Sequence, residues 1–105
     1  MFHHLVAFRF ISDATSDQLS RVHEEISALP SLIPSVRQYR CGFQHSTNPL
    51  NAHYGLCATF DDEHGYLEYR DHPAHLRVVT EVVAPILDHR EAVQFEGPIV
   101  GTIAR

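Results

Sequence analysis

The chain opens with a mostly apolar run over residues 2–11, which predicts a strand whose successive side chains point to opposite faces. The second face of this strand, with Leu5, Ala7 and Ile11, is also largely apolar. A strand with two apolar faces is covered on both sides, so we expect helices on one face and a second subunit on the other. The residues that share the first face are Phe2, His4, Val6, Phe8 and Phe10.

A helix is predicted to follow this strand. Thr15 and Gln18 have the spacing of a capping box, in which each side chain bonds the backbone of the other residue. Apolar residues then recur at spacings of three and four, and His23 borders their stripe. Proline has no amide hydrogen, so the helix is expected to end before Pro30. The stripe consists of Leu19, Val22, Ile26 and Leu29.

Two further strands are predicted over residues 36–45 and 54–60, separated by a loop rich in turn-forming residues. The third strand places Tyr54, Leu56, Ala58 and Phe60 on one face. Its other face carries small side chains, which would let a second sheet approach closely.

A second helical region and a last strand complete the pattern. Asp61 or Asp62 is expected to cap a helix that runs to about Asp71. A second helical segment is expected from His75 to about residue 87, where Pro85 kinks or ends it. The last strand is predicted over residues 91–96. The apolar stripe expected for the second segment is Leu76, Val79, Val83 and Ile86.

The order strand, helix, strand, strand, helix, strand predicts an α+β, ferredoxin-like fold. In this β-α-β-β-α-β arrangement the helices cover one face of a four-stranded antiparallel sheet. We expect residues 1–105 to form a single domain, with a core over residues 3–96 and a C-terminal tail over residues 97–105. The pattern assigns no structure or role to the apolar segment 99–103.

Composition narrows the possible partners and location. The formal net charge is −5 and no basic run occurs, which argues against nucleic-acid binding. No apolar run approaches the ~20 residues of a membrane span, and the chain opens with no secretory pattern. We therefore expect a cytoplasmic protein in which Cys41 and Cys57 stay reduced.

The candidate chemistry is concentrated between Tyr69 and His75. Pro73 disfavours helical geometry at His72, so one helix should end near Asp71 and another should begin in this region. Tyr69 would then close one helix and His75 would open the next, and both side chains could face the same concavity. An imidazole and a phenol together can transfer protons. The alternative is architectural: a tyrosine at a helix end beside two surface histidines.

Metal binding is the weaker interpretation of the same stretch. His72 and His75 are three residues apart, with Glu68 or His64 nearby, but Pro73 interrupts the helix between them. The spacing fixes no third ligand, so we predict no metal site and no cofactor.

The motif Tyr-x-x-His-Pro-x-His, shortly after a strand that ends in Thr-Phe, resembles the signature of the stress-responsive dimeric α/β-barrel family. Further matches are His4-Leu5-Val6, residues 33–36, Gly42 and Thr59-Phe60-Asp61, so the resemblance covers roughly residues 3–96. It implies a homodimer in which two sheets pack face to face as a barrel.

The resemblance also implies a site. In the polyketide cyclases of this family the motif tyrosine and the second motif histidine transfer protons, which corresponds here to Tyr69 and His75 as catalytic residues. Two departures are a tyrosine, Tyr54, in place of a histidine, and the polar His23 and Gln94 at positions of the alkyl pocket. Between sheet and helices we expect a substrate pocket. Its predicted lining is His4, Val6, Phe8, Val22, His23, Ile26, Tyr54, Leu56, Ala58 and His72.

Three functions remain open at this point. The first is a barrel protein of uncertain activity whose Tyr/His cluster is structural. The second is a cofactor-independent cyclase, aldolase-like enzyme or isomerase that acts on a small carbonyl or phenolic compound. The third is a cofactor-free or haem-linked monooxygenase of the same fold.

Overall fold

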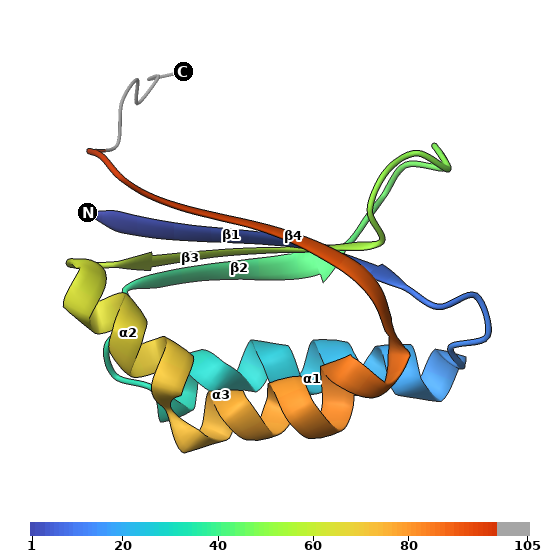
Figure 1. The fold of residues 1–105 in the computed structure, drawn as a ribbon, viewed down its shortest axis with the longest axis horizontal. Helices are drawn as coiled ribbons and strands as arrows, with labels where there is room; N and C mark the ends of the chain where they lie inside the picture. The colour runs from blue at the N-terminus through green and yellow to red at the C-terminus, as the bar shows by residue number, and fades with distance from the viewer. Residues whose placement is uncertain (99–105) are drawn as a thin grey trace.

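The computed structural model describes residues 1–98, in which all helices cover one face of a single sheet (Figure 1). The tail segment 99–103 lies outside these residues. The predicted fold class is confirmed: the sheet has four antiparallel strands in the order β2-β3-β1-β4. The strands are β1 (Phe2–Phe10), β2 (Gln38–Phe43), β3 (Tyr54–Phe60) and β4 (Leu87–Glu96). The helices are α1 (Ser16–Leu32), α2 (Glu63–Asp71) and α3 (Pro73–Arg77), and α3 continues into a π-helical segment (Val78–Val83) and a 3₁₀ turn (Ala84–Ile86).

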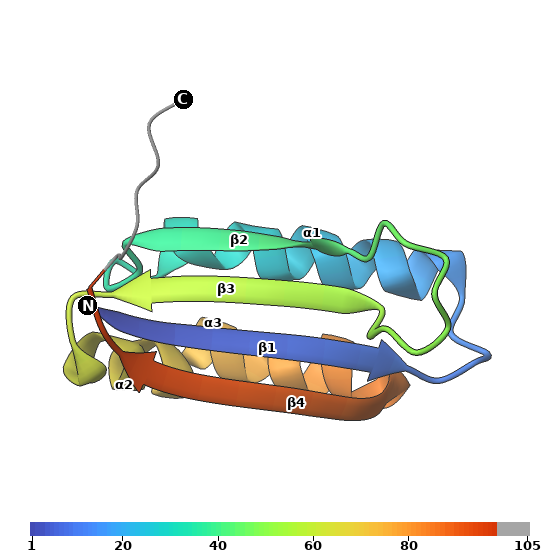
Figure 2. The ribbon, with the colours of Figure 1, turned by 90° about the horizontal axis from the view of Figure 1, so that it is seen from above.

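The described helices lie on one side of the sheet, so the sheet has a covered face and an open face (Figure 2). The pairing of the strands then decides which side chains share a face. Residues paired directly across two antiparallel strands point to the same side. On β1 the predicted row from Phe2 to Phe10 is buried against the helices, with His4 among the apolar residues. The other row, which includes Leu5 and Ala7, faces the open side.

The capping box of α1 forms as predicted: Thr15 accepts a hydrogen bond from the Gln18 amide, and Gln18 accepts one from the Thr15 amide. The prediction that α1 ends before Pro30 is wrong, because the helix runs to Leu32. A proline in the last turn removes only one hydrogen bond there, and the amide of Ile33 still donates to the Leu29 carbonyl. Ile33 itself is extended, as expected for a residue before proline.

The second helical region departs from its predicted stripe. Asp62 caps α2, and α2 ends at Asp71 as predicted. The new helix starts at Pro73 and widens into π-helical turns after Arg77. A π-helix bonds residue i to residue i+5, which rotates the following side chains away from the regular α-helical stripe. Val79 is 39% exposed, and Leu76, which precedes the π-helical turns, is 50% exposed; the buried residues are Val78, Val82, Val83 and Ile86.

Two strand boundaries also differ from the predictions. β2 is shorter than expected and spans only residues 38–43, whereas β4 is longer and begins at Leu87. Pro85 lies in the 3₁₀ turn, Leu87 is already extended, and it pairs with Phe10. β4 is an edge strand with polar, exposed side chains at its start, so an apolar pattern did not mark it.

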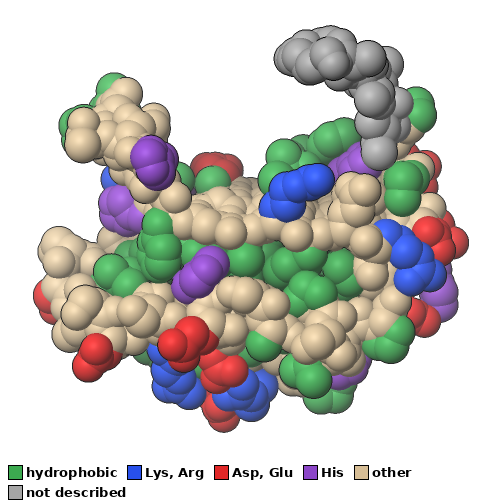
Figure 3. All heavy atoms as spheres, turned by 180° about the vertical axis from the view of Figure 1, so that it is seen from behind, with side chains coloured by type: hydrophobic (Ala, Val, Ile, Leu, Met, Phe, Trp, Pro, Cys, Tyr) green, Lys and Arg blue, Asp and Glu red, His purple; other side chains and the backbone are tan. Residues whose placement is uncertain are grey.

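The layers are joined by apolar packing. Figure 3 shows hydrophobic side chains gathered along the seam between sheet and helices, while charged side chains gather on the outer surface of the helix layer.

Cys41 and Cys57 are both free thiols. Cys41 pairs in register with Leu56 and Cys57 with Arg40, so the two thiols point to opposite faces of the sheet and cannot bridge.

Candidate functional site

A cavity of about 250 Å³ lies between the covered face of the sheet and the second helical region. Its walls are mostly apolar, and several polar side chains reach it, which is the usual composition of a small-molecule site. Seven of the residues predicted for the site line it: His4, Val6, Phe8, Ile26, Leu56, Tyr69 and His75.

His75 is held with one ring nitrogen free. Its Nδ1 lies 2.9 Å from the carbonyl oxygen of Arg70. A carbonyl only accepts hydrogen bonds, so Nδ1 carries the hydrogen and the neutral ring keeps a lone pair on Nε2. Burial is the main cause that lowers the pKa of His75, although the bond to Arg70 opposes it. The imidazole is therefore neutral at pH 7, and Nε2 can act as a base.

Tyr69 packs against this imidazole, with ring centroids 4.5 Å apart. Its hydroxyl lies 3.0 Å from the hydroxyl of Tyr39, which reaches across from β2. Burial raises the pKa of Tyr69 to about 12 and raises that of Tyr39 further. Both phenols thus stay protonated. Their mutual hydrogen bond uses one of the two hydroxyl hydrogens, so the other remains for a ligand oxygen.

His4 forms another polar point of the cavity. Its Nδ1 accepts a hydrogen bond of 2.7 Å from the side-chain amide of Gln94 on β4, and its ring packs on Tyr66. Burial first, and then the positive charges of His75 and Arg90, lower the pKa of His4 to about 4. His4 is therefore a neutral imidazole whose hydrogen is on Nε2.

The other predicted site residues lie outside the cavity lining. Val22 and Ala58 are buried in the core next to it. His23 and Tyr54 form a separate pair, in which Nδ1 of His23 lies 2.8 Å from the Tyr54 hydroxyl. His72 caps α3, where its Nδ1 accepts a hydrogen bond from the amide of Ala74.

Several lining residues were not predicted from the sequence. Tyr39 belongs to the alternation of the second strand and could have been assigned to the helix side with Cys41. Arg90 was missed because the last strand was expected to begin one residue after it. The π-helical turns supply three more apolar residues, of which Val79 and Val83 belong to the predicted apolar stripe and Val78 does not. The unpredicted lining residues are Leu29, Tyr39, Tyr66, Arg70, Val78, Val79, Val83, Ala84, Leu87 and Arg90.

Neither a metal cluster nor a membrane helix occurs in the described part of the chain. Within residues 1–98, no three side chains of His, Cys, Asp or Glu are placed to hold a metal ion. None of the helices described there is long and apolar enough to cross a membrane.

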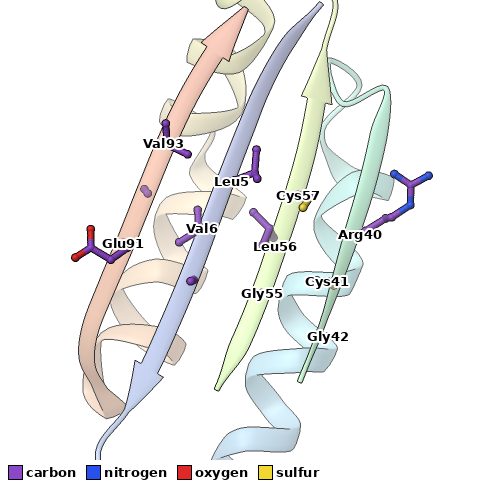
Figure 4. A pocket seen from close by; sticks show the side chains of 12 residues that line it. Leu5, Val6, Arg40, Cys41, Gly42, Gly55, Leu56, Cys57, Glu91 and Val93 are labelled. Atoms are coloured by element: carbon purple, nitrogen blue, oxygen red, sulfur yellow. The ribbon is translucent and has the colours of Figure 1, made fainter. Parts of the chain in front are cut away.

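The open face of the sheet carries a second, shallow hollow of about 590 Å³. Leu5, Val93 and Cys57 project into it, while Arg40 and Glu91 lie at its opposite edges (Figure 4). Gly42 and Gly55 leave its floor without side chains.

Solved structures with the same arrangement include proteins of known and unknown activity. A dimeric ferredoxin-like protein of unknown function from Thermobifida fusca is 35% identical over 90% of this chain and 88% of that chain, with a TM-score of 0.80. A Dabb family protein with a ferredoxin-like fold from Mesorhizobium loti is 23% identical, covering 92% and 96%, with a TM-score of 0.77. A hydroxynitrile lyase from Passiflora edulis is 15% identical, covering 99% and 96%, with a TM-score of 0.79.

Sequence comparison gives the family directly. No curated protein matches the chain. The model of the stress responsive A/B barrel domain matches residues 2–97, nearly the whole chain. Together with the sheet order and the Tyr69–His75 motif, this match shows that the chain belongs to the stress responsive A/B barrel domain family.

Proposed function

We propose that the protein is an enzyme that moves a proton on a small carbonyl compound bound between the sheet and the helices. The observation that carries this proposal is the neutral His75, whose Nδ1 is fixed by the Arg70 carbonyl and whose ring packs on Tyr69 beside the cavity. A base with a free lone pair and a protonated phenol side by side are the two groups that enolisation requires.

The chemical step uses both groups. Nε2 of His75 removes a proton from the carbon next to the carbonyl, and the electron pair of that C–H bond forms the enolate. Negative charge moves to the carbonyl oxygen, which accepts a hydrogen bond from the free hydroxyl hydrogen of the Tyr39–Tyr69 pair. Return of the proton to another carbon completes an isomerisation. Attack of the enolate on a second carbonyl group, with the proton passed to the new alkoxide, forms a carbon–carbon bond.

The fold and the cavity are compatible with this class of reaction. A hydroxynitrile lyase has the same fold, so the scaffold accommodates lyase chemistry. The cavity, at about 250 Å³, is smaller than the ~300–1,000 Å³ of drug-sized ligand sites, which limits the substrate to a small molecule.

Deuterium exchange at carbon tests the proposal. We would incubate small aryl ketones with the protein in D₂O and follow the loss of the α-proton signal by NMR. Replacing His75 by Ala should slow the exchange by about a hundredfold or more, the usual contribution of a general base. His64→Ala, a change at an exposed histidine of α2, is the matched control and should exchange as the wild type does.

Thermal unfolding of both variants separates catalysis from structure. Lost exchange with unchanged stability in His75→Ala supports the base. Exchange that survives the substitution overturns the proposal. Parallel loss of stability and exchange indicates that the Tyr/His cluster is architectural, and the protein is then a structural barrel.

We further propose that the protein is a homodimer through the open face of its sheet. This face carries exposed apolar side chains, among them Val93, which lines the hollow of Figure 4, and Phe95, two positions further along β4. An exposed apolar patch of this kind marks an interaction surface. The related proteins from Thermobifida fusca and Bacteroides fragilis are dimeric, which supports a second copy of this chain as the occupant.

A further inference from the structure

The charge of the cavity differs from that of the protein. The chain has a formal net charge of −5, yet no aspartate or glutamate among residues 1–98 lines the cavity. In this part of the chain, the lining side chains with basic nitrogen are His4, Arg70, His75 and Arg90. Of these, the two arginines are always charged, since a guanidinium does not lose its proton in proteins.

Arg90 is a cation of the cavity that remains available to a ligand. It lies opposite Phe8 in the register of β1 and β4, so its side chain emerges on the helix side of the sheet, exposed at the rim of the cavity. Within residues 1–98 no ion pair or hydrogen bond involves its guanidinium, and its charge lowers the pKa of both His4 and His75. Four other arginines do pair with carboxylates: Arg21, Arg37, Arg70 and Arg77.

The acidic group that acts on His75 does not neutralise Arg90. Asp71 affects the pKa of His75, but its two carboxylate oxygens lie 2.8 and 3.1 Å from the guanidinium nitrogens of Arg70. Asp71 also lies outside the cavity lining. The Arg70 charge is thus balanced by its own partner, whereas no carboxylate of residues 1–98 balances the charge of Arg90 at the mouth.

We propose that the cavity binds a small carboxylic acid, with the carboxylate on Arg90 and the apolar body against the walls formed by Leu56, Val78 and Val83. A guanidinium presents two parallel donors that match the two oxygens of a carboxylate. A single guanidinium also balances the single charge of a carboxylate, whereas a phosphate brings more charge than one arginine neutralises. Binding of the acid does not depend on the proposed function. The inference rests on that function only where it names the substrate of the reaction, a small oxo-carboxylic acid.

A pair of ligands with the same shape and different charge tests the inference. Benzoate and benzamide have almost the same outline, but only benzoate carries the charge. Their dissociation constants would be measured by NMR titration of the wild type, Arg90→Gln and Arg21→Gln. The last variant is the matched control, since it removes the same charge from an exposed position on α1.

We expect benzoate to bind the wild type roughly fivefold to tenfold more tightly than benzamide, as hydrogen bonds to charged groups exceed neutral ones by about that factor. Arg90→Gln should abolish the difference and Arg21→Gln should keep it. A difference that survives in Arg90→Gln, or tighter binding of phenyl phosphate than of benzoate, overturns the assignment.

The outcomes also separate this inference from the enzymatic proposal. Binding of benzoate through Arg90 without His75-dependent proton exchange supports the carboxylate site and refutes the chemistry. His75-dependent exchange on neutral ketones without a preference for benzoate over benzamide supports the chemistry and refutes the carboxylate site. If neither the benzoate and benzamide pair nor the aryl ketones bind, both the carboxylate site and the enzymatic proposal are refuted.

Discussion

His4 should make the stability of the protein fall in mild acid. The histidine is only 6% exposed, and its pKa is lowered from 6.5 to about 4 by burial and by the charges of His75 and Arg90. The unfolded chain therefore takes up a proton at a higher pH than the folded chain does. Stability is complete above pH 6.5, decreases as the pH falls from 6.5 to 4, and changes no further through this group below pH 4.

The magnitude follows from the two pKa values. A tenfold change in proton affinity corresponds to ~1.4 kcal/mol, so lowering the pKa of His4 from 6.5 to about 4 removes about 3 kcal/mol over the full range. At pH 5 about 2 kcal/mol of this is already lost. That is a large share of the 5–15 kcal/mol by which domains are typically stable.

Urea unfolding at pH 7.5 and pH 5 measures the effect. Both experiments need the same protein concentration, because association raises apparent stability by mass action. His4→Gln keeps a polar group beside Gln94 but cannot titrate, so its free energy of unfolding should change by about 2 kcal/mol less between the two pH values. His64→Gln removes an exposed histidine that is hydrated whether the chain is folded or not, and should behave as the wild type. Equal losses in wild type and His4→Gln would refute the reasoning.

Three further predictions concern the base, the phenol pair and the open face. The kcat/KM for proton exchange should rise with pH and level off with an apparent pKa below 6.5, because burial lowers the pKa of His75 and only the neutral ring is a base; a limb centred above 6.5 contradicts this. Tyr69→Phe should lower the free energy of unfolding by about 1–3 kcal/mol in urea, since Tyr39 then keeps a hydroxyl without its partner. Adding Tyr39→Phe should recover part of that loss, and strictly additive losses would argue against the pair. Val93→Glu, at a side chain 53% exposed in the subunit, should yield folded monomers in sedimentation, whereas an unchanged dimer would place the interface elsewhere.

Local patterns were enough to predict the architecture. The alternation of β1 identified its buried row, including His4, because side chains of a strand point to opposite faces in turn. The capping residues of α1 and α2 were predictable because they satisfy backbone groups within their own first turn. Pro73 separated two helices, which brought Tyr69 and His75 to the same cavity.

Features that depend on contacts distant in sequence could not be predicted. Val78 rather than Leu76 is buried in the second helical region, and the local periodicity carries no sign of the π-helical turns that start there. Tyr39 bonds a hydroxyl thirty positions away, so its role depends on how β2 faces α2. Arg90 lies on an exposed edge strand, where polar residues hide the alternation that would have revealed its direction.

Gly42 and Gly55 pair across β2 and β3 at the floor of the hollow on the open face. A Cβ at either position would meet no atom of residues 1–98 within 4 Å. Packing within the described part of one subunit therefore does not require glycine there, and random mutation would introduce larger side chains at both positions. Where natural variation keeps them empty, the constraint comes from whatever is pressed against the sheet. Glycine retained at these two positions among related sequences would therefore indicate a constraint from assembly and not from the folding of one subunit.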